Sequence, residues 1–89
     1  MTVLTSSIAE QLIEEQGTDI VISNIYTSIE DFAFDGNQLT SVIIPNSVTS
    51  IGDGAFDDNK LASIFIPDGV THIGKRAFDG NQLKNVDSR

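Results

Sequence analysis

The 89-residue sequence predicts an α+β repeat solenoid, and two observations support this fold class. From about residue 17 onward the sequence repeats with a period of 22, which Phe34, Phe56 and Phe78 keep, and the hexapeptide FDGNQL occurs at 34–39 and again at 78–83. The segment before the repeats has a helical apolar pattern instead. A fixed period of this length indicates stacked coils, each of which buries its apolar face only against its neighbours.

Residues 1–16 are expected to form an N-terminal capping region, with the helix itself at about 7–16. Ser7 followed by Glu10 has the form of a capping box, and Gly17 is a suitable C-terminal stop. The apolar residues of the segment fall on one helical face, and these are Ile8, Ala9, Leu12 and Ile13. We expect the helix to cover the first exposed coil, as terminal caps do in solenoids.

Residues 17–89 are expected to form the solenoid, because the repeats align there without gaps. The predicted coils are 17–38, 39–60 and 61–82, followed by a partial coil at 83–89. Strands of successive coils are expected to pair in parallel, about 4.8 Å apart.

The second coil shows the expected course of each repeat. Residues 41–44 are mostly β-branched, which favours a strand, and Pro45 ends it because proline donates no ladder hydrogen bond. A second extended piece follows at 48–51. About one helical turn is then expected at 53–56, and a turn at 57–59.

These repeats resemble the BspA-like, type-5 leucine-rich repeats. That family's motif is roughly LTSVTIPxSVTSIGxxAFxxNxL, and residues 39–61 read LTSVIIPNSVTSIGDGAFDDNKL. The resemblance covers about residues 17–86. It implies a short leucine-rich-repeat-like stack with a role in binding or adhesion rather than catalysis, often outside the cell or at its surface. It supplies no functional residues to carry over.

The composition restricts the class of partner. A net charge of −8 and a predicted pI near 4.1 disfavour nucleic acid and anionic membranes. Because no apolar stretch approaches the ~18 residues of a membrane span, we expect no membrane insertion. If Met1 is the natural start, the cytoplasm is the expected compartment, since the first residues lack a signal-peptide pattern. A fragment of a longer protein would instead be expected at the cell surface or secreted.

The outward face of the predicted sheet carries the candidate binding residues. Side chains alternate along a strand, so two columns should point outward from the stack. The first column is Asp19, Ser41, Ser63 and Asn85, and the second is Val21, Ile43 and Phe65. The family pattern usually has threonine at the second column, whereas this chain has three apolar residues, and exposed apolar patches tend to mark interaction sites.

We therefore predict a protein partner that binds Val21, Ile43 and Phe65, with Ser41 and Ser63 beside them. Two alternatives stay open. Bulky residues could be present only because they favour a strand, or the N-terminal helix could fold across them.

A second column is acidic and gives a metal hypothesis. Asp35, Asp57 and Asp79 should stack about 5 Å apart, and calcium takes oxygen ligands of this kind. Ordinary turn chemistry explains the same residues better, because aspartate accepts from nearby backbone N–H groups and asparagine can form ladders along a stack. The asparagines two places further on are Asn37, Asn59 and Asn81. We expect no cofactor, with calcium at these turns as the alternative.

No enzyme is expected, because no nucleophile-and-base signature or phosphate loop is present. His72 is a lone histidine expected at the surface, and Lys75 and Arg76 should compensate nearby acidic columns rather than form a basic patch. The chain stops inside a fourth coil with Val86 as its last inward residue. An open strand edge invites pairing, so an end-to-end homodimer through this coil is a further alternative.

Overall fold

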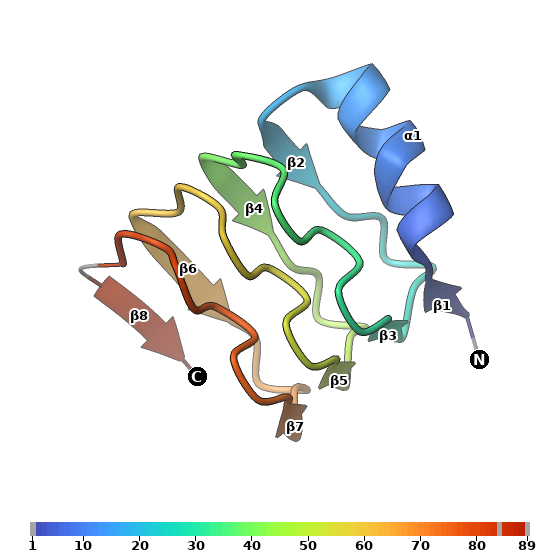
Figure 1. Ribbon diagram of the computed structural model, residues 1–89. Coiled ribbons are helices and arrows are strands. Elements are labelled where there is room, and N and C mark those ends of the chain that lie inside the picture. Colours follow the sequence, from blue (N-terminus) through green and yellow to red (C-terminus); the bar gives the residue numbers. More distant parts are fainter. Residues whose placement is uncertain (1, 84, 89) are drawn as a thin grey trace.

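The computed structural model describes residues 2–83 and 85–88, and the side-chain surroundings of residues 2–83. One helix, α1 (Ser6–Gln16), lies at the N-terminal end of a stack of coils whose strands follow in two rows (Figure 1). The strands are β1 (Val3–Leu4), β2 (Asp19–Val21), β3 (Ser28–Ile29), β4 (Ser41–Ile43), β5 (Ser50–Ile51), β6 (Ser63–Ile66), β7 (His72–Ile73) and β8 (Asn85–Ser88). No helix in the described part of the chain is long and apolar enough to span a membrane.

The strands pair in parallel, and from β2 onward they keep the 22-residue register that the repeat predicts. β1, β3, β5 and β7 form a four-stranded sheet in that order, while β2 pairs with β4 and β6 with β8. Ser50 lies opposite Ser28 on one side and His72 on the other. β4 and β6 are neighbours but share no ladder, so the row that we expected to be continuous is divided at this point.

The N-terminal segment contributes a strand as well as a helix, which the sequence pattern does not predict. The N–H of Thr27 donates to the carbonyl of Thr2 at 2.8 Å, and Leu4 pairs with Ile29. Leu4 is fully buried. Residues 2–4 therefore occupy the place of one more coil in the four-stranded sheet before the chain turns into α1.

The predicted capping box of α1 is wrong. The N-cap is Thr5, whose hydroxyl accepts from the N–H of Ile8 at 3.3 Å, and the helix begins at Ser6 rather than at Ser7. Thr5 takes the extended conformation of an N-cap because it directly follows β1. The predicted stop at Gly17 is confirmed by its φ of 75° and by its N–H, which donates to Ile13 at 2.8 Å.

The predicted helical turn at 53–56 is also wrong. The N–H groups of Ala55 and Asp57 donate to carbonyls three residues earlier, which makes consecutive turns. Gly54 has a φ of 61° and Asp58 a φ of 57°, and this left-handed conformation interrupts a right-handed helix.

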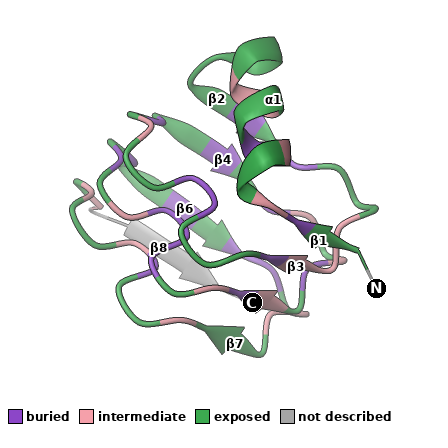
Figure 2. Cartoon of the chain, turned by 45° about the vertical axis from the view of Figure 1, so that its right-hand side comes forward, coloured by how far each residue is buried: buried purple, intermediate pink, exposed green. Residues whose placement is uncertain are grey.

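The core lies between the two rows of strands, where buried residues of successive coils meet (Figure 2). Phe34, Phe56 and Phe78 form a parallel stack with ring centroids 5.2 and 5.4 Å apart. Phe34 and Phe56 are fully buried, whereas Phe78 and Leu83 at the C-terminal end are only half-buried. The apolar face of α1 covers the opposite end, as predicted, with Ala9 completely buried.

Candidate binding face and stacked acidic turns

Val21, Ile43 and Phe65 come from β2, β4 and β6 and are exposed on the outer side of these strands. Their side chains are 55%, 60% and 43% exposed. The residues that directly precede them, Ile20, Val42 and Ile64, are buried. The alternation expected for a strand with one buried side is therefore present in three successive coils. We call Val21, Ile43 and Phe65 the apolar face.

Polar residues border the apolar face. Asp19 lies opposite Ser41, and its Oδ1 accepts from the hydroxyls of Thr40 at 2.8 Å and Ser41 at 3.1 Å. Ser63 is exposed, and its backbone is in register with Asn85. The side chains of Asn85 and Val86 lie outside the described residues. The serines that we predicted beside the apolar face thus lie on the same strands at its edge.

The helix does not fold across the apolar face, which excludes one alternative drawn from the sequence. α1 instead caps the edge of β2 through Gln16, whose Oε1 accepts from the N–H of Val21 at 2.8 Å. The Nε2 of the same side chain donates to the carbonyl of Val21 at 3.3 Å. Gln16 therefore takes the hydrogen-bonding place of a missing neighbouring strand while the Val21 side chain stays exposed.

Other exposed apolar side chains lie away from the apolar face, and the sequence pattern does not single them out. They are Val3, Ile25, Phe32 and Ile73. Phe32 has a φ of 59°, and its ring lies so close to Gly54 that a Cβ there would overlap it. In the sequence, the exposed ring of Phe32 is indicated only by the glycine one coil later, Gly54, which leaves room for it.

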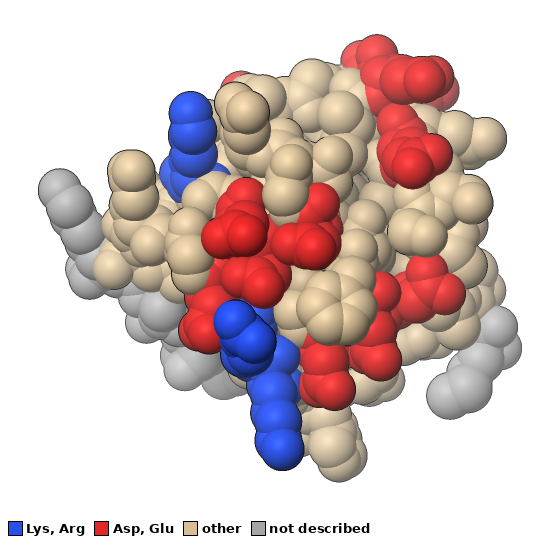
Figure 3. Space-filling view, viewed as in Figure 1, with Lys and Arg blue, Asp and Glu red and all other residues tan. Residues whose placement is uncertain are grey.

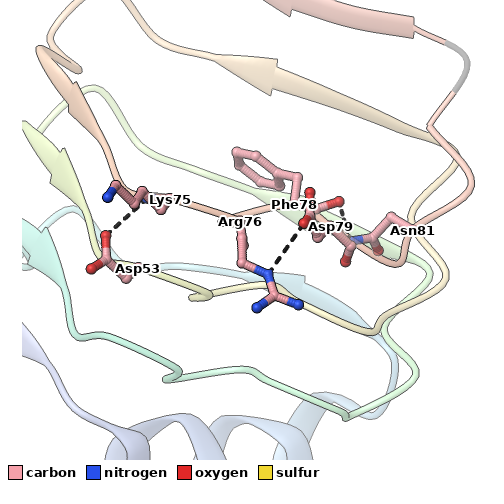
Figure 4. A network of polar contacts seen from close by, with 6 residues as sticks. All are labelled: Asp53, Lys75, Arg76, Phe78, Asp79 and Asn81. Atoms are coloured by element: carbon pink, nitrogen blue, oxygen red, sulfur yellow. Dashed lines mark hydrogen bonds and ion pairs between the residues drawn. The ribbon is translucent and has the colours of Figure 1, made fainter.

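The acidic turns bring together a different set of carboxylates from the predicted one. Oxygen atoms of Asp35, Asp57 and Asp58 lie within 4.8 Å of one another. Asp79 does not join them and instead forms an ion pair with Arg76 at 3.4 Å, between exposed side chains (Figure 4). Asp58 directly follows Asp57, at a column that holds glycine in the other two coils, Gly36 and Gly80.

The asparagines of these turns bond to backbone groups of successive coils, whereas a ladder between asparagine side chains is not seen among the described residues. Asn59 is buried, and its Oδ1 accepts from the N–H groups of Leu39 at 2.9 Å and Asn37 at 3.2 Å. Its Nδ2 donates to the carbonyls of Phe34 and Phe56, each at 2.9 Å. Asn81 repeats the pattern one coil later and donates to the carbonyls of Phe56 and Phe78. Turn chemistry therefore accounts for the asparagines.

The two adjacent cations of the third coil have different surroundings. Figure 4 shows Arg76 turned toward Asp79, while the backbone N–H of Lys75 donates to Oδ1 of Asp53 at 2.9 Å. The compensation that we expected is confirmed for Arg76. His72 is exposed, as expected, and its Nδ1 lies 3.2 Å from the hydroxyl of Thr71.

Comparison with known proteins identifies the repeats. The family model of a BspA-type leucine-rich repeat region, six copies long, matches residues 12–89. Searches of curated proteins and of solved structures give no match. The family match extends over nearly the whole stack, including the second half of α1, and agrees with the 22-residue register of the strands. The chain belongs to the BspA-type leucine-rich repeat family.

Proposed function

We propose that the chain is a non-enzymatic protein-interaction module, a short leucine-rich-repeat solenoid that binds a protein partner through the apolar face. The observation that carries this proposal is the exposure of Val21, Ile43 and Phe65 on three successive coils. Leucine-rich repeat modules generally bind proteins and are generally not enzymes. The chain's family therefore supports the class of function, and the exposure of the apolar face supports this site for it.

The surroundings of the apolar face suit a binding site. An interface typically has an apolar centre and a polar rim, and aromatic side chains often supply much of the binding energy. Phe65 provides an aromatic side chain, and Ser41 and Ser63 provide polar groups beside it. The backbone of β2 and β4 is already held by ladder hydrogen bonds, so little conformational entropy would be lost on binding.

The test compares three baits in a pull-down with quantitative identification of captured proteins: wild type, the double variant Ile43→Thr with Phe65→Thr, and Ile25→Thr. Threonine suits a strand, so circular dichroism and melting should show an intact fold. We expect the wild type and Ile25→Thr to capture a protein that the double variant does not capture. Ile25 is the matched control because it is equally exposed but lies outside the apolar face. Equal capture by all three baits would reject this face.

A second candidate function is a structural repeat that calcium stabilises at the acidic turns. The observation that favours it is the approach of Asp35, Asp57 and Asp58 to within 4.8 Å. A ligand that binds only the folded state raises its melting temperature. We expect millimolar calcium to raise the melting temperature of the wild type but not of Asp57→Asn. A melting temperature that neither calcium nor EDTA changes would reject this candidate.

Self-association through the C-terminal coil is the third candidate. Ile73 is half-exposed and Phe78 and Leu83 are half-buried, although their counterparts in the second coil, Ile51, Phe56 and Leu61, are buried. A second copy could cover them. Size-exclusion chromatography with light scattering should then show a dimer, whereas a monomer at high concentration would exclude this candidate.

A further inference from the structure

A groove of about 540 Å³ runs along the four-stranded sheet and is separate from the apolar face. Residues of β1, β3, β5 and β7 line it, and none of Val21, Ile43 and Phe65 does. Val3 and Ile73, both about half exposed, lie on the first and last strands of the sheet. The groove therefore crosses the coils and has an apolar side chain toward each end.

Two glycines explain why the surface is hollow here. Gly52 and Gly74 occupy the same place in successive coils and line the groove. A Cβ at Gly52 would lie 2.8 Å from the Cα of Asp31, and one at Gly74 would lie 2.6 Å from the Cα of Asp53. Neither position has room for a side chain, so the close approach of one coil to the next leaves a line without side chains along the groove.

Three carboxylates line the groove in fixed positions. Asp31 accepts from the N–H of Asp53 at 2.8 Å, and Asp53 accepts from the N–H of Lys75 at 2.9 Å. Glu30 accepts from the N–H of Ser6 at 2.8 Å. Each bond uses one carboxylate oxygen. Among the described residues, no hydrogen bond or ion pair reaches the second oxygen of Asp31 or Asp53, so this oxygen is available to a ligand.

The charge of the groove selects a cationic ligand. Its lining contains three carboxylates and, among the described residues, no lysine or arginine. Figure 3 shows acidic side chains spread over one face of the molecule, with basic ones gathered in two places. Arg76, one of the few cations, is already paired with Asp79. The three carboxylates outnumber His72 in the lining and the neighbouring Lys75, so a positive group entering the groove would compensate part of the net charge of −8.

The spacing of the carboxylates favours a chain with several cations over a single metal ion. Asp31 and Asp53 are one coil apart, which is about 4.8 Å along the stack. Within the described residues, neither belongs to the group of acidic side chains that converge closely enough to hold one ion. An extended peptide instead places every second side chain on the same side, so arginines or lysines can face the carboxylates along the groove.

We propose that this groove binds an extended segment of a partner protein in which every second residue is basic. Its basic side chains would pair with Glu30, Asp31 and Asp53. The residues between them would point away from the groove. This second surface is independent of the apolar face proposed above and gives the module a way to recognise charge.

The probe for this proposal is a fluorescein-labelled hexapeptide of alternating valine and arginine, with a valine–glutamine peptide as the uncharged comparison. Fluorescence anisotropy at low salt measures its Kd. The test variant is Asp31→Asn with Asp53→Asn, because asparagine still offers an oxygen to the N–H of the next coil. We expect the Kd to rise about tenfold, in line with two partly exposed ion pairs. The valine–glutamine peptide should bind the wild type about as weakly as the valine–arginine peptide binds the double variant.

Two further variants separate the groove from general attraction. Glu15→Gln with Asp68→Asn removes the same charge from exposed positions outside the groove, and its Kd should match the wild type. Ser50→Lys places a cation inside the groove, at a column that tolerates the larger His72, and should abolish binding. The double variant of the apolar face, Ile43→Thr with Phe65→Thr, should bind the probe normally.

Three results would overturn the proposal. The first is no binding of the valine–arginine peptide by the wild type. The second is an equal loss in both charge-matched pairs, which would indicate attraction to the net charge alone. The third is a loss in the apolar-face variant with none in Asp31→Asn and Asp53→Asn, which would place the probe on that face.

Discussion

The Oδ1 atom of Asn59 accepts a hydrogen bond at 2.9 Å from the N–H of Leu39, a residue that precedes it by 20 positions. The same side chain donates through Nδ2 to the carbonyls of Phe34 and Phe56. A single buried amide thus joins the backbones of two successive coils at the turn where each coil ends. Each coil buries its core residues only against the neighbouring coils, so the fold depends on such connections.

Asn59→Ala should destabilise the fold by about 3 kcal/mol or more, because several buried backbone groups would lose their partner at roughly 1–3 kcal/mol each. The free energy of unfolding from urea titration measures this. Asn37→Ala is the control from the same column: its Nδ2 makes one bond, to Asp35, and it is less buried. We expect a loss below about 1 kcal/mol there. Equal losses would contradict the role given to Asn59.

Phe56→Ala should cost about 3–5 kcal/mol, because the ring is fully buried and stacks on both Phe34 and Phe78. That is most of the stability of a domain whose total is on the order of 5–15 kcal/mol. Phe78→Ala removes a half-buried ring that stacks on one side and should cost clearly less. Chemical unfolding of both variants checks the order, and a larger loss for Phe78→Ala would contradict the end of the stack described here.

Gly52→Ala should destabilise the protein even though alanine normally stabilises a glycine position with ordinary backbone angles. The new Cβ would lie 2.8 Å from the Cα of Asp31 in the preceding coil. Forcing the coils apart should cost about 1–3 kcal/mol. A melting temperature equal to or above that of the wild type would show that the coils do not approach as closely as described.

Thr5→Ala should cost about 1 kcal/mol, because the N-cap hydroxyl accepts from the N–H of Ile8. In a domain of this size, such a loss lowers the melting temperature by about 4–8 °C. Ser7→Ala changes an exposed residue inside the first turn and should leave the melting temperature nearly unchanged. The opposite order would restore the capping box that the sequence suggested.

The sequence predicts the stack well because the requirement it reflects is strict. Phe34, Phe56 and Phe78 must coincide from coil to coil to bury one another, so their spacing reports the register of the strands directly. The outward position of Ile43 and Phe65 follows from the same register and from alternation along a strand. Their binding of a partner stays a prediction.

The features that the sequence does not predict depend on irregular positions. β1 is missed because Thr2 matches Thr27 at a distance of 25 residues rather than 22. The acidic group contains Asp58, which is irregular because its column holds glycine in the other two coils, Gly36 and Gly80. The groove depends on the missing side chains of Gly52 and Gly74. Glycine has no functional group that would mark such a site in the sequence.

The most direct test of the central claim is the Kd of the captured partner, measured by calorimetry for the wild type and for Ile43→Thr with Phe65→Thr. Losing two exposed apolar contacts at the centre of an interface should weaken binding at least about tenfold, since hot-spot truncations cost about 2 kcal/mol or more. Ile25→Thr should leave the Kd unchanged. A double variant that binds as tightly as the wild type, with its fold intact, would contradict the assignment of the apolar face.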